Sequence, residues 1–447
     1  MSAIINNSFR KFQADNFIGS FSTNNMYLAI GKNTAWSGAS ASEYTETTPS
    51  DNNIPVPIDT TASLYTHYND MIAAKRITNT SVSHVVKRVD WTSGTVYVEY
   101  DHHIDDIIDQ NFFVFTEDFR VYKCISNGGG VASTVKPTGV GPAIIETSDN
   151  YRWKFMFEVQ QADVLKFITT DWVPVNSPAN ASQPDQANTE GAAVDGALEH
   201  IDVTAGGTGY RSNTGTAQSG STTNTIVLEA GASNTDDYYN NMTVYISSGQ
   251  GQGELKTITD YDGTNKVATV STNWTTIPTN ASVYEVMPAV TVSSSDGSSG
   301  VARVSGVAAG VITKVSMTNV GTGYRSATAT VSSGSGSNAV LAPRIGPSGG
   351  HGKNAVAELG GAYVMLNARL IGADGSSDFP VGDDFRKVHL LVNPTTGNTT
   401  PPTLATGTTY DSTEIDEDSG KIIYTEFRAP ISRASDSTED IKIVAEF

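Results

Sequence analysis

The hexapeptide Gly207-Thr208-Gly209-Tyr210-Arg211-Ser212 occurs a second time in this chain, as Gly321-Thr322-Gly323-Tyr324-Arg325-Ser326. The similarity extends upstream, where Leu198, Ile201 and Val203 stand in register with Ile312, Val315 and Met317. For each copy this spacing predicts a strand with one apolar face that runs into a glycine-rich turn. The repeat also divides the chain, because Ser/Thr/Gly-rich segments lie inside it and the aromatic-rich segments lie outside it.

This division predicts the fold class and the domain organisation. We expect a mainly β protein, with a β-sandwich core that carries a few short helices in its loops. Residues 1–197 and 345–447 form the two halves of that core, and 198–344 form an inserted all-β domain. A smaller β module, at about 225–286, is nested between the hexapeptides. A short Gly/Ser linker in place of the insert should leave a folded core, because loop closure costs little extra with length.

Length, net charge and cysteine count limit the classes of protein to which this chain can belong. The 447 residues suffice for two or three domains. A net charge of −19 argues against a nucleic-acid or membrane binder, which normally carries a basic face. The single cysteine, Cys124, excludes an intrachain disulfide and fits a protein folded in a reducing cytoplasm. No apolar run reaches 18 residues, so we expect no transmembrane helix.

The periodicity outside the insert predicts strands with few helices. The clearest helix is 62–76, where Leu64, Tyr68, Met71 and Ile72 form one apolar stripe. A shorter helix is expected at 8–19, one or two helical turns at 162–168, and a linker at 176–197. Strands are expected at 26–31, 82–89, 95–100, 112–115, 119–125, 151–159, 363–371, 384–392, 421–427 and 440–446.

The segment Asp101–Asp109 is the densest group of possible metal ligands. Its two histidines and four aspartates could hold a metal ion. Adjacent histidines on a strand point to opposite faces, however, which makes joint ligation awkward. We therefore expect a polar loop or short helix with buried isoleucines, and no metal or cofactor.

Other motifs do not combine into catalytic chemistry. Residues 346–350 match the G-x-S-x-G pattern but lack the strand-to-helix context of a nucleophile elbow. The acidic segments 374–378 and 416–420 do not complete a calcium loop and are expected to be solvated turns. No nucleophile, base and orienting group come together in the sequence, so we expect no enzymatic activity and no catalytic residues.

Tyr210 and Tyr324, in the two hexapeptides, are the candidate glycan-binding residues. A tyrosine in such a turn can stack on a sugar ring. The alternative is that each ring packs over its own glycine turn, which is the commoner use of a buried aromatic side chain.

The segments that flank the insert resemble a known family. The N-terminal part carries Tyr27-Leu28-Ala29-Ile30-Gly31, Trp36, and Val85-Val86-Lys87-Arg88-Val89-Asp90-Trp91, followed by Val121-Tyr122-Lys123-Cys124 and Tyr151-Arg152-Trp153-Lys154-Phe155-Met156-Phe157. The C-terminal part carries 385–394, 419–431 and 439–444, and the 419–431 stretch is the most specific. Together these segments resemble the baseplate wedge subunit of contractile-tailed phages, the gene-eight product family of T-even phages.

The resemblance implies a structural virion protein. It would be a homodimer in the tail baseplate, assembled in the host cytoplasm, where it contacts other wedge subunits. Such a protein has no catalytic residues, no bound nucleic acid and no membrane insertion. The insert at 198–344 is not expected in the T-even form. Two alternatives stay open: a receptor- or glycan-binding tail protein that acts through the insert, and a polysaccharide hydrolase suggested by the abundant carboxylates.

Overall fold

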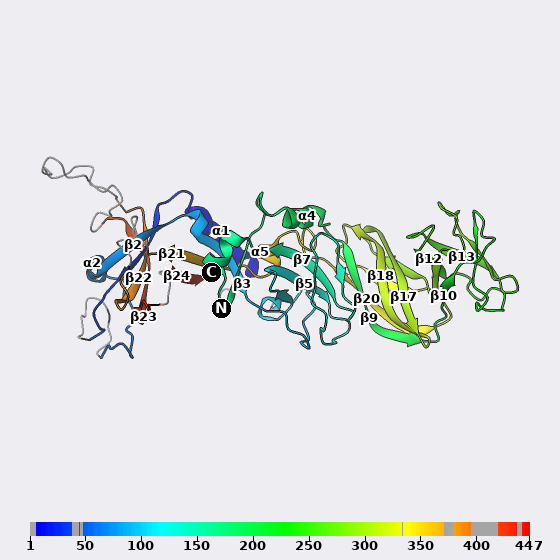
Figure 1. Ribbon diagram of the computed structural model, residues 1–447, viewed down its shortest axis with the longest axis horizontal. Coiled ribbons are helices and arrows are strands. Elements are labelled where there is room, and N and C mark those ends of the chain that lie inside the picture. The colour runs from blue at the N-terminus through cyan, green and yellow to red at the C-terminus, as the bar shows by residue number, and fades with distance from the viewer. Residues whose placement is uncertain are drawn as a thin grey trace. The chain divides into compact units, whose positions relative to one another are not determined.

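The computed structural model of the chain describes residues 6–37, 44, 48–104, 106–332, 334–370, 379–394, 419–435 and 440–447. Its secondary structure is mainly β, with antiparallel sheets and short helices, which confirms the expected fold class (Figure 1). The chain divides into two compact units. The first unit comprises Met1–Val89, Phe157–Gln183 and Ala355–Phe447, and the second comprises Asp90–Met156 and Pro184–Asn354. No helix among the described residues is long and apolar enough to cross a membrane.

The first unit is a β-sandwich of two four-stranded sheets, with strand orders β2-β1-β22-β23 and β24-β21-β3-β8. Its strands are β1 (Met26–Gly31), β2 (Met71–Ile77), β3 (Val82–Lys87), β8 (Trp172–Val175), β21 (Tyr363–Arg369), β22 (Asp384–Val392), β23 (Lys421–Ser432) and β24 (Asp440–Glu446). Its helices are α1 (Asn7–Ser20), α2 (Thr61–Asn69), η1 (Asn79–Ser81), α3 (Gln161–Phe167) and α5 (Ala355–Glu358). Side chains from both sheets, such as Leu28 and Leu390 from one and Val364 and Leu366 from the other, fill one core.

The second unit contains three groups of strands. The first is the sheet β4-β5-β7-β6, formed by β4 (Phe113–Phe115), β5 (Arg120–Ser126), β6 (Ile145–Glu146) and β7 (Arg152–Glu158), whose last two residues belong to the first unit. The helices η2 (Ile107–Asp109) and α4 (Pro184–Ala192) accompany it. Its core is aromatic: Trp153 is completely buried, stacks on Tyr151 and meets the edge of Tyr97.

The second group contains the hexapeptides. It consists of the sheet β16-β19-β20-β9 and the hairpin β17-β18. The strands are β9 (Leu198–Thr208), β16 (Val290–Ser293), β17 (Ser298–Ala308), β18 (Val311–Thr322), β19 (Thr328–Val331) and β20 (Ser337–Ile345). Strands β9, β17, β18 and β20 lie side by side in Figure 1. Leu198 pairs with Ile345, so the two ends of the proposed insert lie close together. A short linker in place of the insert requires this proximity.

The third group is a small module between the hexapeptides. Its sheet, β10-β15-β12-β13-β14-β11, is formed by β10 (Asn213–Thr216), β11 (Thr225–Val227), β12 (Thr243–Ser248), β13 (Leu255–Asp262), β14 (Val267–Val270) and β15 (Val283–Met287). The module has a core of its own, in which Ile226, Met242, Val244 and Tyr284 are completely buried or nearly so.

The structure extends the repeat beyond the hexapeptides. Strand β9 pairs with β20 and β18 pairs with β17, so each hexapeptide strand has an equivalent partner strand. Ser299 and Asn338, at equivalent places in β17 and β20, both adopt a positive φ, at 66° and 64°. Residues 198–345 thus form a tandem duplication in which the nested module interrupts only the first copy, after Ser212. In the second copy, Ser326-Ala327-Thr328 leads directly into β19.

Removal of the nested module should therefore leave the rest of the second unit folded. Deleting 213–287 joins Ser212 to Pro288 and gives Arg-Ser-Pro-Ala-Val-Thr-Val, which matches the length of Arg325–Val331. We expect a soluble protein in which β9, β17, β18 and β20 keep their amide-exchange protection, measured by mass spectrometry. A deletion of 205–279, of the same length, is the control. It removes the Gly207–Ser212 turn and should abolish that protection. Aggregation of the first deletion would contradict the duplication.

Three local expectations are wrong. The expected helix 62–76 ends at Asn69, because Met71–Ile77 is β2 and pairs along β1 from Gly31 to Met26. Of the expected strand 95–100, only an isolated bridge between Thr95 and Ser133 forms. The expected linker 176–197 contains the helix α4. In the first case strand pairing with β1 overrides a local periodicity that fitted a helix.

Candidate functional site

The segment Asp101–Ile104 forms a tight turn in the second unit, not a strand. The Ile104 N–H donates to the Asp101 carbonyl at 3.2 Å, and the Asp101 Oδ1 accepts the His103 N–H at 3.0 Å. An aspartate in the first position of a turn commonly accepts a hydrogen bond of this kind. The turn thus follows from local sequence chemistry.

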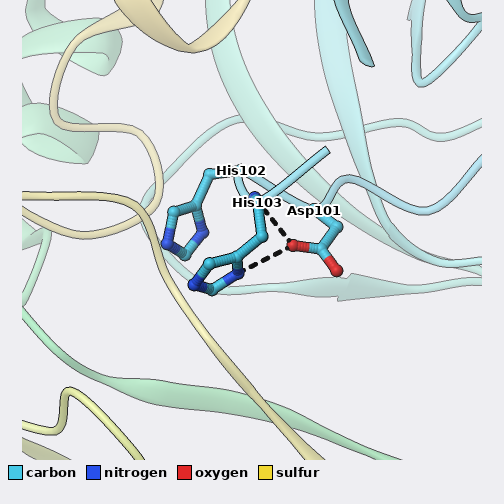
Figure 2. Close-up of side chains that lie close together, drawn as sticks. All are labelled: Asp101, His102 and His103. Carbon is cyan, nitrogen blue, oxygen red and sulfur yellow. Dashed lines mark hydrogen bonds and ion pairs between the residues drawn. The ribbon is translucent and has the colours of Figure 1, made fainter. Parts of the chain in front are cut away.

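The two histidines of this turn lie on the same side (Figure 2). The centroids of the His102 and His103 rings are 3.9 Å apart, and His103 Nδ1 lies 3.0 Å from Asp101 Oδ1. The expectation that the two rings point to opposite faces is wrong, because that rule applies to an extended strand. The turn therefore gathers the donor atoms of Asp101, His102 and His103 within 4.8 Å of one another.

Burial and neighbouring charges shift the pKa values of His102 and Asp101. Partial burial lowers the pKa of His102, and the adjacent His103 lowers it further. Burial opposes ionisation of Asp101, but hydrogen bonds from His103 and the charge of Arg344 hold the pKa of Asp101 below its usual value. Both shifts favour the forms of His102 and Asp101 that can donate an electron pair.

Arg344, on β20, connects the turn to a second polar group on β9. Its Nη1 donates to Asp101 Oδ2 at 2.8 Å and its Nε donates to Asp202 Oδ2 at 2.5 Å. Asp202 in turn accepts a hydrogen bond from His200 Nε2 at 2.6 Å. Burial opposes ionisation of Asp202, yet His200 and Arg344 lower its pKa overall.

Arg152, on β7, continues this network and is nearly buried. Its Nη1 donates to His200 Nδ1 at 2.6 Å, and its Nη2 donates to the Val315 carbonyl of β18 at 3.2 Å. Its Nε lies 3.4 Å from Glu146, which also pairs with Lys314. One side chain therefore joins the aromatic sheet to both strands that lead into the hexapeptides.

A cavity of about 880 Å³ lies over this network. Glu99, Arg152, His200, Asp202 and Lys314 contribute to its walls. Most of these groups are already engaged: Glu99 accepts hydrogen bonds from the Ser126 hydroxyl and the Asn127 N–H, and His200 uses both ring nitrogens. Because these charged groups are paired with one another, the arrangement fits a structural ionic network better than a reactive centre.

This network was not predicted from the sequence. A signal was present, because His200 and Asp202 are two residues apart on a predicted strand and so share one face. The partners Arg152 and Arg344 could not be inferred, since each lies in a different segment of the chain.

The other sequence motifs have simple structural roles. Ser348, in the G-x-S-x-G match, lies in a turn well before α5, and the Gly350 N–H donates to the Pro347 carbonyl at 2.7 Å. His351 beside it is buried, and burial lowers its pKa. The acidic segment 374–378 and Asp416–Asp418 of the other lie outside the described residues.

Tyr210 and Tyr324 each lie over the glycine that immediately precedes the facing strand. Tyr210 covers Gly336, and its hydroxyl accepts the Ala339 N–H at 3.3 Å. Tyr324 covers Gly297, and its hydroxyl accepts the Gly300 N–H at 2.9 Å. Both side chains are buried. This geometry favours the packing role, and glycan binding by either ring remains a prediction.

Substitution of either covered glycine by alanine should destabilise the second unit. A Cβ at Gly297 or Gly336 would overlap the ring of Tyr324 or Tyr210, and neither glycine has a positive φ, so the effect is steric. We expect each variant to lose about 1–3 kcal/mol, the usual cost of overpacking, as a lower melting temperature in calorimetry. Gly191→Ala, which meets no atom within 4 Å, is the control and should not be destabilised. Unchanged melting of Gly297→Ala would contradict the packing role.

Comparison with known families gives a match to part of the chain. The model of the family described as Bacteriophage T4, Gp8 matches residues 352–447. A search of curated proteins finds no match. The matched region includes the stretch 419–431, so the resemblance inferred from sequence is confirmed for the C-terminal region.

Proposed function

With a C-terminal region similar to the Bacteriophage T4 Gp8 family as the premise, we propose that this chain is a structural subunit of a contractile-tail baseplate wedge. In this proposal it acts as a homodimer that bridges other baseplate subunits and resides in the virion tail. The family match is the single observation that carries the proposal, and the fold of the first unit supports it.

The matched region does not form a sandwich without the N-terminal segments. It supplies β21 to β24, but β1 lies between β2 and β22, and β21 lies between β3 and β24. The N-terminal strands therefore belong to the same structural unit as the matched region. We extend the proposed family relationship to the first unit on this basis.

Buried ionic contacts favour a rigid support over a catalytic role. Arg386 on β22 is 5% exposed and donates to Asp51 at 2.8 and 3.0 Å and to Asp384 at 2.7 and 3.0 Å. A guanidinium held by two carboxylates in this way fixes a loop onto a sheet. A subunit that transmits force between neighbours needs this stiffness.

Strand β23 is the surface that we propose for dimer formation. Among the described residues it pairs only with β22, so its other edge has no partner strand. Ile423, Tyr424 and Ile431 are all exposed on this 12-residue strand. Such an edge favours pairing with another chain.

Sedimentation and mass photometry test the dimer. We expect a particle of twice the 47.3 kDa chain mass, and a monomer for the double variant Ile423→Lys/Tyr424→Lys. Leu165→Lys, at an exposed position on α3, is the matched control and should stay dimeric. A wild-type monomer would contradict the dimer. Failure of the dimeric protein to co-purify with any wedge subunit expressed beside it would contradict the bridging role.

The alternative function is receptor or glycan binding through the inserted domain. It now depends on surfaces other than the covered faces of Tyr210 and Tyr324. A glycan array probed with the full chain distinguishes the two functions, since a wedge subunit should show no saturable glycan binding.

A further inference from the structure

We propose that the turn Asp101–His103 is a binding site for a transition-metal ion, for which Zn²⁺ is the best match. The proposal is independent of the baseplate role. Two imidazoles and one carboxylate form a donor set that suits zinc and leaves coordination positions open for water or another ligand. Figure 2 shows that the three side chains point to the same side of the turn.

The donor atoms are close together. They lie within 4.8 Å of one another, and bonds of about 2.0–2.1 Å to one ion would bring them to about 3.3 Å apart. Rotation of the side chains can provide that change, because His103 is 71% exposed. Within the described part of the chain, His102 makes no hydrogen bond, so its ring nitrogens need not give up a protein partner.

The Asp101 carboxylate is fixed by a hydrogen bond from Arg344. Arg344 binds Asp101 through Oδ2 and is itself anchored by Asp202. Oδ1 accepts the His103 N–H and contacts His103 Nδ1, and a bound ion would replace the contact with Nδ1. Metal-bound carboxylates are commonly fixed by a second hydrogen-bonding group of this kind. The positive charge of Arg344 opposes a bound cation, so we expect an affinity well below that of a structural zinc site.

A small cavity beside the turn supplies a second observation. The cavity has a volume of about 100 Å³ and is lined by residues that include Asp101, His103, Arg344 and His351. His351 is 4% exposed, and its Nδ1 has no hydrogen-bond partner. An unpaired buried nitrogen costs stability, so a water molecule or another bound group is expected beside it. A water molecule bound to the metal could provide the missing partner.

The other group with metal-ligand spacing, Glu99, His200 and Asp202, is less suitable. Both nitrogens of His200 are engaged, by Arg152 and by Asp202. Arg344 occupies the second carboxylate oxygen of Asp202. A metal ion there would have to displace two guanidinium contacts from a buried site.

Calorimetric titration of the untagged full chain with Zn²⁺ tests the proposal. We expect one equivalent to bind, and His102→Gln and His103→Gln each to weaken binding by about 10-fold or more. Co²⁺ in place of Zn²⁺ should give visible absorption bands that both variants lose. Glu99→Gln is the matched control and should bind like the wild type.

Three results would overturn the proposal. These are no saturable Zn²⁺ binding by the wild type, wild-type affinity in both histidine variants, or loss of binding in Glu99→Gln alone. The last result would assign the metal to the Glu99 group. Because His102 and His103 lie on a surface turn, circular dichroism should show that both variants remain folded, which keeps a loss of binding interpretable.

Discussion

Replacement of Arg152 by methionine should destabilise the second unit by about 3–5 kcal/mol, the usual cost of removing one partner from a buried ionic network. Methionine fills a similar volume but donates no hydrogen bond. The change leaves His200 Nδ1 and the Val315 carbonyl without their donor. It also removes the positive charge beside Glu146. The aromatic sheet would then lose its polar connection to β9 and β18.

Urea unfolding and amide exchange of peptides from β9 and β18 measure this effect. Peptide-resolved exchange is needed because a chain with two units need not unfold in one step. Arg325→Met is the matched control, since Arg325 forms an exposed pair with Asp195 in the same unit and its loss should have little effect. Equal protection in Arg152→Met and Arg325→Met would show that the network does not stabilise the unit.

Acidification from pH 7 to pH 5 should destabilise the first unit through a buried histidine pair. The ring centroids of His67, on α2, and His389, on β22, are 5.0 Å apart. His67 Nδ1 and His389 Nε2 have no hydrogen-bond partner, and the Lys387 side chain lies beside both. Burial lowers the pKa of His67 to about 4 and that of His389 to about 3. The charge of Lys387 adds to both shifts and His67 adds to that of His389, whereas Asp70 partly opposes the shift of His67.

Proton linkage determines whether the free energy of unfolding rises or falls with pH. The unfolded chain takes up protons at both histidines as the pH falls through about 6.5, whereas the folded chain does so only near pH 4 or below. Stability is therefore full above pH 6.5 and falls as the pH decreases between 6.5 and 4. At pH 5 the loss is about 2 kcal/mol per histidine and about 4 kcal/mol for the pair, provided that both folded pKa values stay below 5.

Amide exchange of β22 peptides at pH 7 and pH 5, corrected for the intrinsic rate, measures this loss. The double variant His67→Gln/His389→Gln removes both titrating groups and should lose about 4 kcal/mol less than the wild type over the same pH range. A wild type whose protection changes no more than that of the double variant would contradict the buried, neutral state of the pair. Each protein is compared with itself, so a general destabilisation by the substitutions does not affect the result.

The sequence by itself determined the features that depend on local pattern. The apolar residues Leu198, Ile201 and Val203 identified β9, and the repeated hexapeptide identified β18 as its equivalent. The stretch 419–431 identified the family of the C-terminal region. Periodicity could not distinguish a helix from a strand at Met71 and Ile72, because these apolar residues fit either pattern. Pairing with β1 then decided the outcome.

Only the tertiary structure decided which polar groups meet. Arg344 binds Asp101 from 243 positions away in the sequence, and Arg152 reaches Val315 from 163 positions away. Periodicity shows which face of a strand is buried, but not which distant side chain that face meets. The turn that gathers His102 and His103 on one side was likewise decided by backbone geometry, since an extended strand would have separated them. The fold class could therefore be predicted from the sequence, whereas the candidate metal site and the buried network required the packed structure.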